Sequence, residues 1–100
     1  MATFDITSEA KEDLYMIWDY TADTWSEQQA DRYYSILVSS FNKIAADPLN
    51  IGKPFDEIVP GLRAYHVRCH MVFYATQSNE RVLIVRILHE KMDYPKHLNP

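Results

Sequence analysis

The apolar residues of this chain change their spacing once, near the middle, and this change limits the fold more than any other feature. Before residue 47 they recur every three or four positions, which predicts amphipathic helices, and after residue 61 they alternate, which predicts strands. One hundred residues suffice for one domain, so residues 1–100 are assigned to a single domain. The pattern predicts an α+β fold, with an antiparallel αα-hairpin packed on one face of an antiparallel β-sheet, in the order β-α-α-β-β-β.

The first forty-six residues predict a short strand and two helices. Residues 2–6 alternate as a strand does, and Thr7 or Ser8 then offers an N-cap for a helix over residues 9–22. Acidic residues crowd the first turn of this helix, where the helix dipole favours negative charge.

A second helix is predicted over residues 27–46. Ser26 and Gln29 have the spacing of a capping box, and Asp47-Pro48 ends the helix because the residue before proline avoids the helical region. Since so few residues separate the two helices, they must form an antiparallel hairpin.

The second half predicts a loop, a meander of three strands and a polar tail. Prolines and glycines punctuate the loop over residues 48–61. Strands are predicted over residues 62–68, 71–76 and 81–88, with short turns that make the neighbouring strands antiparallel. The last strand is apolar on both faces apart from Arg86, so it is expected inside the sheet.

Charge and composition exclude several functional classes. Residues 1–50 carry nine acidic and three basic side chains, whereas residues 51–100 carry five and seven, so any basic site lies in the second half. The single cysteine, Cys69, precludes an internal disulfide and suits a reducing cytoplasm. Two glycines cannot form a phosphate-cradling loop, no cofactor or metal is expected, and neither a signal peptide nor a membrane-spanning segment is visible.

Three segments together resemble the ParE/RelE toxin superfamily, and the ParE branch most closely. They are EAKEDLYMIWDY with the following helix that ends in FNKIAADP, VPGLRAYHVRCHMVFY, and VLIVRILHEKMDYPKHL. The last segment, which matches the ending of ParE members, is the most specific of the three. The likeness covers nearly the whole chain.

The resemblance implies a toxin of a type II toxin–antitoxin system in the cytoplasm, without a cofactor and without a membrane. ParE toxins are described as poisoning DNA gyrase, and a ParD-like antitoxin neutralises them through a C-terminal segment that folds on binding. The complex is then hetero-oligomeric, and the toxin contacts DNA only through the antitoxin. Expected antitoxin contacts are Tyr15, Trp18, Tyr34, Leu37, Arg63 and Arg68. Expected target contacts are Arg86, His89 and Met92.

Two alternatives remain open. A RelE-like, ribosome-dependent mRNA endoribonuclease needs acid–base groups and cations around the scissile phosphate. Its candidate catalytic residues are Arg63, Arg68, Arg86, His89, Lys91 and His97. The chain departs from the RelE pattern because it has no lysine-rich stretch. The other alternative is a non-toxic interaction module on the same scaffold.

Structural roles compete with these functional ones. Arg86 is an equal candidate for pairing with a carboxylate, and Arg63 for pairing with Asp56 or Glu57. The imidazoles of His66 and His70 are expected to be solvated or hydrogen-bonded, without a metal. The tryptophans Trp18 and Trp25 are expected in the core and as a helix staple.

Overall fold

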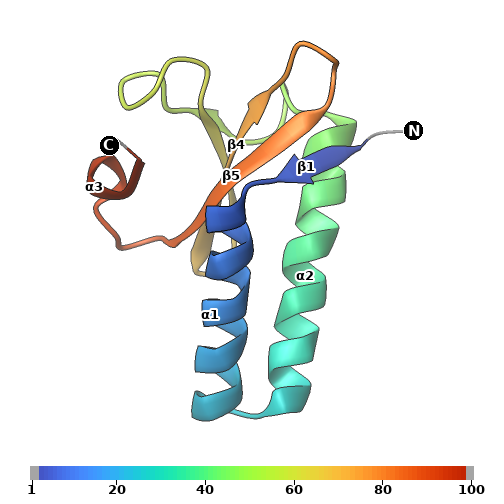
Figure 1. Ribbon diagram of the computed structural model, residues 1–100, viewed down its shortest axis with the longest axis vertical. Coiled ribbons are helices and arrows are strands. Elements are labelled where there is room, and N and C mark those ends of the chain that lie inside the picture. Colours follow the sequence, from blue (N-terminus) through green and yellow to red (C-terminus); the bar gives the residue numbers. More distant parts are fainter. Residues whose placement is uncertain (1–2, 99–100) are drawn as a thin grey trace.

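The computed structural model describes residues 3–98 and has two layers (Figure 1). A helical hairpin lies against one face of a five-stranded sheet, and its far end projects beyond the sheet. The elements in chain order are β1 (Phe4–Ile6), α1 (Ser8–Thr24), α2 (Glu27–Ala46), β2 (Lys53–Pro54), β3 (Arg63–Val67), β4 (His70–Thr76), β5 (Val82–His89) and α3 (Tyr94–Leu98).

The caps of the two long helices are those that the sequence predicts. The Thr7 hydroxyl accepts a hydrogen bond from the Ala10 amide at 3.0 Å, and the Ser26 hydroxyl accepts one from the Gln29 amide at 3.1 Å. Each bond satisfies an amide that the first turn of a helix leaves without a partner. The caps therefore fix where α1 and α2 begin.

The sheet has the strand order β1-β5-β4-β3-β2 and is mixed. The meander of β3, β4 and β5 is antiparallel, as predicted, and β5 lies inside the sheet. The expectation of an entirely antiparallel sheet is wrong at one edge, because β1 runs parallel to β5. The chain reaches β5 only after crossing both helices, and such a long crossover is what a parallel pair requires.

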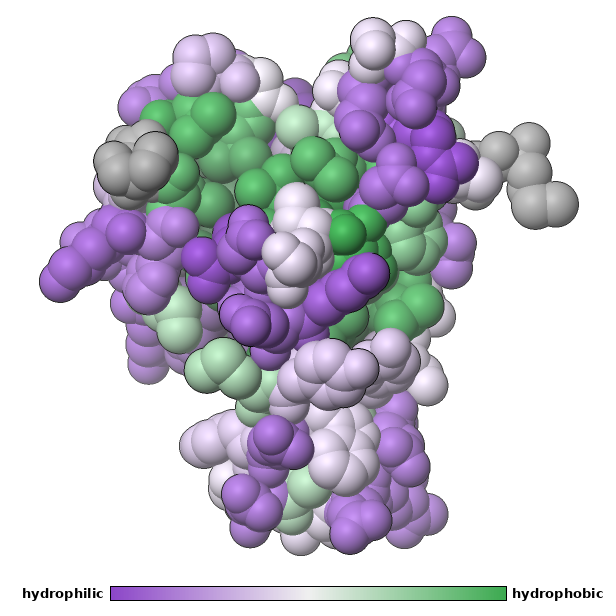
Figure 2. Space-filling model, viewed as in Figure 1, coloured by the Kyte–Doolittle hydropathy of each residue, from purple (hydrophilic) through white to green (hydrophobic). Residues whose placement is uncertain are grey.

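Hydrophobic residues fill both faces of the sheet. On the helix face, buried Leu37 and Phe41 of α2 pack with Val72 and Tyr74 of β4. On the opposite face, Phe73 packs with residues of the loop 55–62 and of α3, so that face is covered as well. Figure 2 shows hydrophobic residues gathered over the sheet, whereas the projecting hairpin is largely polar.

β5 is apolar on both faces because both are covered, and a β-bulge decides which of its residues lie on which face. Phe73 of β4 pairs with Arg86, but the next residue, Tyr74, pairs with Ile84, so one residue of β5 has no counterpart. The extra residue shifts the alternation, and Ile84 and Ile87 consequently pack toward the same helices although they are three positions apart.

Several boundaries differ from the expectations. His70 begins β4 instead of lying in a turn, β2 forms inside the predicted loop, and residues 94–98 of the predicted tail form α3. The parts of the first strand and of the tail that fall on residues 1–2 and 99–100 lie outside the described residues. None of the helices within residues 3–98 is long and apolar enough to cross a membrane.

Candidate functional site

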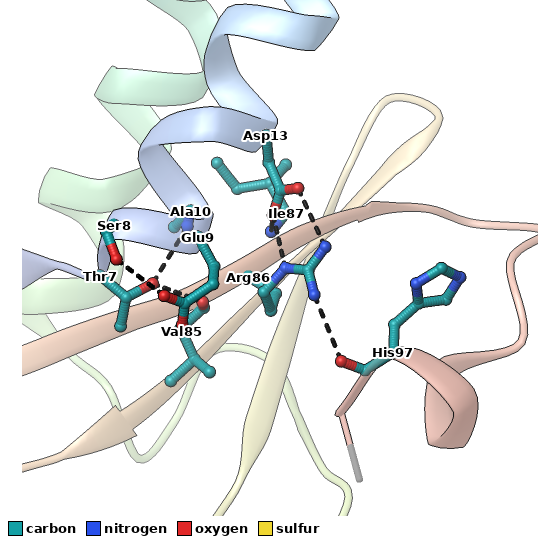
Figure 3. A network of polar contacts seen from close by, with 9 residues as sticks. All are labelled: Thr7, Ser8, Glu9, Ala10, Asp13, Val85, Arg86, Ile87 and His97. Carbon is teal, nitrogen blue, oxygen red and sulfur yellow. Dashed lines mark hydrogen bonds and ion pairs between the residues drawn. The ribbon is translucent and has the colours of Figure 1, made fainter. Parts of the chain in front are cut away.

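Arg86 forms a nearly buried ion pair with Asp13, which the sequence analysis did not single out (Figure 3). Its Nε and Nη2 atoms donate to the two oxygens of the Asp13 carboxylate at 2.8 and 3.1 Å, and Nη1 donates to the His97 carbonyl at 3.2 Å. The hydrogen bond to Asp13 raises the pKa of the Arg86 guanidinium above its ordinary value, although partial burial acts in the opposite direction. Arg86 therefore joins the start of α1 to α3.

The start of α1 also covers the edge of β5 beyond the point where β1 ends. The Thr7 hydroxyl donates to the Val85 carbonyl at 2.7 Å, and the Ile87 amide donates to the Asp13 carboxylate at 2.9 Å (Figure 3). These side chains satisfy groups that a neighbouring strand would otherwise pair. A partner strand consequently finds no open place on this part of β5.

Arg63 holds the loop between α2 and β2. Its Nη2 atom donates to the carbonyl oxygens of Leu49 and Gly52 at 3.1 and 3.2 Å, and its Nε atom donates to the Tyr74 hydroxyl at 3.3 Å. The predicted structural role is thus found, but the predicted acidic partners, Asp56 and Glu57, are wrong. The Tyr74 hydroxyl lies 2.6 Å from two further carbonyls of the same loop.

The six candidate catalytic residues are not brought together at one point, although Arg86 donates to the His97 carbonyl and the Lys91 amide donates to His89. Arg63 and Arg68 lie at opposite ends of β3, about 16 Å apart along an extended strand. Arg86 is engaged by Asp13, and His97 lies on α3. Of the six, only Arg68 and His89 line one cavity, and the exposed Lys91 follows His89 in the chain. The surroundings that ribose cleavage needs are not assembled around a single point.

An open groove of about 920 Å³ lies between the projecting hairpin and the end of the sheet. We call it the hairpin groove. Its apolar lining residues are Met16, Ile17, Tyr20, Trp25, Ile36 and Met92. Tyr20 and Trp25 are each 69% exposed and Met16 is 67% exposed. Large apolar side chains that stay this exposed in a small domain mark a contact surface.

A polar cluster lies at the floor of the hairpin groove. The Tyr33 hydroxyl and the Nδ1 atom of His70 are 2.6 Å apart, the Cys69 thiol lies beside both, and the His89 ring meets the His70 ring edge-on. Burial, assisted by the neighbouring His89, lowers the pKa of His70 to about 4. Burial, assisted by Cys69, raises the pKa of the Tyr33 hydroxyl above its usual range.

Both groups are therefore neutral near pH 7. The Tyr33 hydroxyl keeps its proton and donates a hydrogen bond to the Nδ1 atom of His70. Such a pair orients two rings and makes a poor acid or base near pH 7. Sequence reasoning missed it because Tyr33 and His70 are 37 positions apart. Among residues 3–98, no cluster of His, Cys, Asp or Glu could hold a metal ion.

The predicted antitoxin and target residues divide between the groove and other places. Arg68, His89 and Met92 line the hairpin groove. Tyr15, Trp18 and Tyr34 are not among its described lining residues, although Tyr15 and Tyr34 are exposed. Tyr15, Trp18 and Tyr34 therefore remain predicted antitoxin contacts.

The assignments of Leu37 to the antitoxin surface and of Trp18 to the core are wrong. Leu37 is wholly buried in the core, so it is not an anchor on the surface. Trp25, expected as a helix staple, is largely exposed and lines the hairpin groove. Trp18 is half-buried, and its indole donates to the Asp31 carboxylate at 2.9 Å. Helical spacing marks the apolar face, but it does not say where along the hairpin the sheet stops covering that face.

A second groove of about 490 Å³ lies between α2 and β3. We call it the edge groove. Arg32, Lys43 and Arg68 line it together with serines of α2 and with residues 65–67 of β3. It shares Arg32, Ile36 and Arg68 with the hairpin groove, so the two surfaces are continuous.

Comparisons with known proteins agree on one family. The family described as "ParE toxin of type II toxin-antitoxin system, parDE" matches residues 4–94. Toxin ParE1 of Mycobacterium tuberculosis is 36% identical over 93 residues, which cover 93% of this chain and 94% of that relative. Toxin ParE1 of Caulobacter vibrioides is 34% identical over 98 residues, with 98% and 99% covered.

A solved structure shares the fold. It is described as the chromosomal ParDE TA system from P. aeruginosa, and it matches with a TM-score of 0.78 at 20% identity, covering 89% of this chain and 96% of that one. At this identity the likeness supports only the arrangement of helices and strands. The family assignment rests on the match over residues 4–94. The chain belongs to the ParE family of toxins of type II toxin–antitoxin systems.

Proposed function

We propose that this toxin arrests growth by binding and poisoning DNA gyrase, and that a ParD-like antitoxin silences it by occupying the hairpin groove. The observation that carries the proposal is the groove itself, which is large, open and lined by exposed apolar side chains. An amphipathic helix buries its apolar face in such a groove through residues spaced three and four apart. A segment that folds on binding can cover the groove and its surroundings together.

The groove also offers a way for binding to neutralise the toxin. His89 and Met92, two of the predicted target contacts, line the hairpin groove, and Met92 is 45% exposed. An antitoxin helix seated there covers both residues, so antitoxin and target compete for one surface. The third predicted target contact, Arg86, acts indirectly in this proposal, because its ion pair with Asp13 positions the end of β5.

Binding without catalysis fits the chemistry of the chain better than mRNA cleavage does. Arg63 donates its hydrogen bonds to carbonyls of the loop, and Arg86 donates to the Asp13 carboxylate. His70 has a pKa of about 4 and accepts from Tyr33, so it is a poor acid or base near pH 7. A free thiol at Cys69 suits the reducing cytoplasm, where we place the toxin.

A plasmid assay tests the target. Purified toxin, DNA gyrase, ATP and supercoiled plasmid should give linear DNA after denaturation and proteolysis, because trapped cleavage complexes release broken DNA. Translating ribosomes with the same toxin should give no cuts in mRNA. Cuts in mRNA without linear plasmid would assign the RelE-like activity, and neither product together with normal growth on expression would assign the non-toxic interaction module.

The antitoxin site is tested with the product of the neighbouring reading frame. Trp25→Ala removes an exposed anchor, so it should weaken antitoxin binding about ten-fold or more without changing stability. The matched control is Leu49→Ala, which removes an equally exposed side chain outside the groove. Equal affinities for the two variants would refute the assignment of the hairpin groove to the antitoxin.

A further inference from the structure

We infer that the edge groove binds the phosphate backbone of double-stranded DNA through Arg32, Lys43 and Arg68, without reading the base sequence. The contact itself does not depend on the proposed function. Its role rests on that function, because the DNA concerned is the segment that gyrase has cleaved. The inference goes beyond the resemblance, which implies that the toxin contacts DNA only through its antitoxin.

The first feature that carries the inference is a set of cations without carboxylate partners. Arg32, Lys43 and Arg68 are exposed and line the edge groove, and none of the described residues that line it is acidic. The ion pairs among residues 3–98 join other residues. His66 also lines the groove, but it pairs with Glu90 at 3.2 Å and is not counted with the three cations. The whole chain carries a net charge of −4, so this concentration of positive charge is local and suits an anion.

The polar residues of α2 follow one line along the edge groove. Cations stand at both ends of the line and serine hydroxyls lie between them: Arg32, Ser35, Ser39 and Lys43. Their spacing of three and four positions places them on one face of the helix. The line is about 16 Å long, since a helix rises about 1.5 Å per residue, and about five phosphates of one DNA strand fit within that length. Arginine, lysine and serine are usual donors to the phosphate oxygens of DNA.

The second feature is the backbone at Arg68. Val67 pairs with His70, so Arg68 and Cys69 form a two-residue turn between β3 and β4. Arg68 has a φ of +57°. Such a turn favours glycine at its first position, because a residue with a Cβ atom is strained at positive φ. Strain of this kind is found where a side chain serves a site, and the Arg68 side chain lines both grooves.

These features favour DNA over an acidic protein segment as the occupant. A peptide binds tightly through apolar anchors in pockets, but the apolar lining residues Ile36 and Tyr65 are half-buried and Val67 is buried. A phosphate backbone makes charged and polar contacts, which are those that the exposed part of the lining offers.

The acidic character of the remaining chain confines the DNA contact to the edge groove. Binding is therefore weak for the toxin alone, and it becomes effective when gyrase holds the toxin and the DNA together. The edge groove shares Arg32 and Arg68 with the hairpin groove, so an antitoxin seated in the hairpin groove also blocks the DNA contact.

The probe for the test is a fluorescent DNA duplex of about 20 base pairs, and the readout is anisotropy with the toxin at several salt concentrations. The logarithm of the association constant should fall with the logarithm of the salt concentration with a slope of about −2.7, because each of three neutralised phosphates contributes about −0.9. A rise in salt of about four-fold should thus weaken binding about forty-fold. Duplexes of different base sequence should bind alike.

Variants test the three cations. Arg32→Gln/Lys43→Gln leaves one contact, so the slope should shrink to about −0.9. The control Lys11→Gln/Lys96→Gln makes the same charge change at exposed positions outside the groove and should keep the slope of the unchanged toxin. Arg68→Gly removes a cation and relieves the turn, so the slope should shrink by about 0.9 while the urea midpoint does not fall.

Three results would overturn the inference. One is a control variant that loses as much affinity as the groove variant. Another is a lower urea midpoint for Arg68→Gly with an unchanged slope, which would give Arg68 a structural role only. The third is a hexaglutamate peptide that binds more tightly than the duplex at the same salt concentration, which would make the groove a site for an acidic protein.

The plasmid assay tests the role of the contact. With Arg32→Gln/Lys43→Gln, the toxin concentration that gives half-maximal linear DNA should rise about ten-fold, because fewer contacts hold the cleaved DNA. An unchanged toxin that traps gyrase but does not bind the duplex retains the proposed function and loses the DNA contact. A toxin that binds the duplex but gives no linear plasmid retains the DNA contact and loses the proposed function.

Discussion

Removing the Asp13 carboxylate should destabilise this protein more than almost any other change of a charged residue. Asp13→Ala deletes the acceptor of three hydrogen bonds, two from Arg86 and one from the Ile87 amide. The side chain of Asp13 is 11% exposed and that of Arg86 is 23% exposed, so water compensates only in part. The guanidinium and the amide are then both left without their partner.

The magnitude follows from this burial. Breaking a buried ion pair from one side costs about 3–5 kcal/mol, and partial access of water to Arg86 favours the lower end, about 3 kcal/mol. Small domains are stable by only about 5–15 kcal/mol, so the loss is a large part of the total. The melting temperature should fall by roughly 12–24 °C, because 1 kcal/mol corresponds to about 4–8 °C in a domain of this size.

Urea unfolding followed by circular dichroism measures the free energy of unfolding directly. Glu12→Ala, at an exposed neighbour on the same helix, should change it by less than about 0.5 kcal/mol. The double variant Asp13→Leu/Arg86→Met should lose less than the sum of its two single changes, since neither charge is left alone. A loss of under about 1 kcal/mol for Asp13→Ala, as for exposed pairs, would refute the reasoning.

Three further predictions concern stability. Asp5 has a pKa of about 2 in the folded chain, lowered mainly by its hydrogen bond from Arg81, so its contribution is present above pH 3.8 and is lost as the pH falls toward 2. Asp5→Asn should therefore flatten the dependence of the urea midpoint on pH in that window. His70 has a pKa of about 4 against 6.5 when unfolded, so the unfolded chain binds more protons between these values and stability falls as the pH drops through them. NMR titration should show the His70 midpoint near 4, and His70→Gln should weaken the loss of stability over that window. Gly52→Ala should cost about 2–3 kcal/mol through its positive φ and the close carbonyl, whereas Gly61→Ala, with φ +82° and no atom within 4 Å, should cost about 1 kcal/mol; equal losses in urea unfolding would contradict the close approach.

Local patterns in the sequence predict the elements well because short-range forces set them. Helical spacing and the Ser26 cap locate α2 at residues 27–46, the bounds that the structure has. Alternation and short turns locate the three strands of the meander within one or two residues. The parallel pairing of β1 with β5 has no local signal, because the two strands are far apart in the sequence and meet only when the helices and the meander have packed.

The candidate site was only partly predictable from the sequence, for the same reason. Arg68, His89 and Met92 were selected from the sequence and line the hairpin groove. Met16 and Trp25 were not selected as contacts, because their exposure results from a hairpin that is longer than the sheet that covers it. Leu37 was selected in error, since helical spacing does not distinguish the covered half of the hairpin from the projecting half.

The sequence by itself determined the helices, the meander, their caps and the family of this toxin, since each depends on neighbouring residues or on motifs along the chain. Only the tertiary structure decided which charges are available. It brings Asp13 to Arg86 and Tyr33 to His70 across 73 and 37 positions, and it leaves Arg68 without an ion-pair partner among residues 3–98. The physical reason is that burial and pairing depend on distances in space, which packing of the hairpin on the sheet creates.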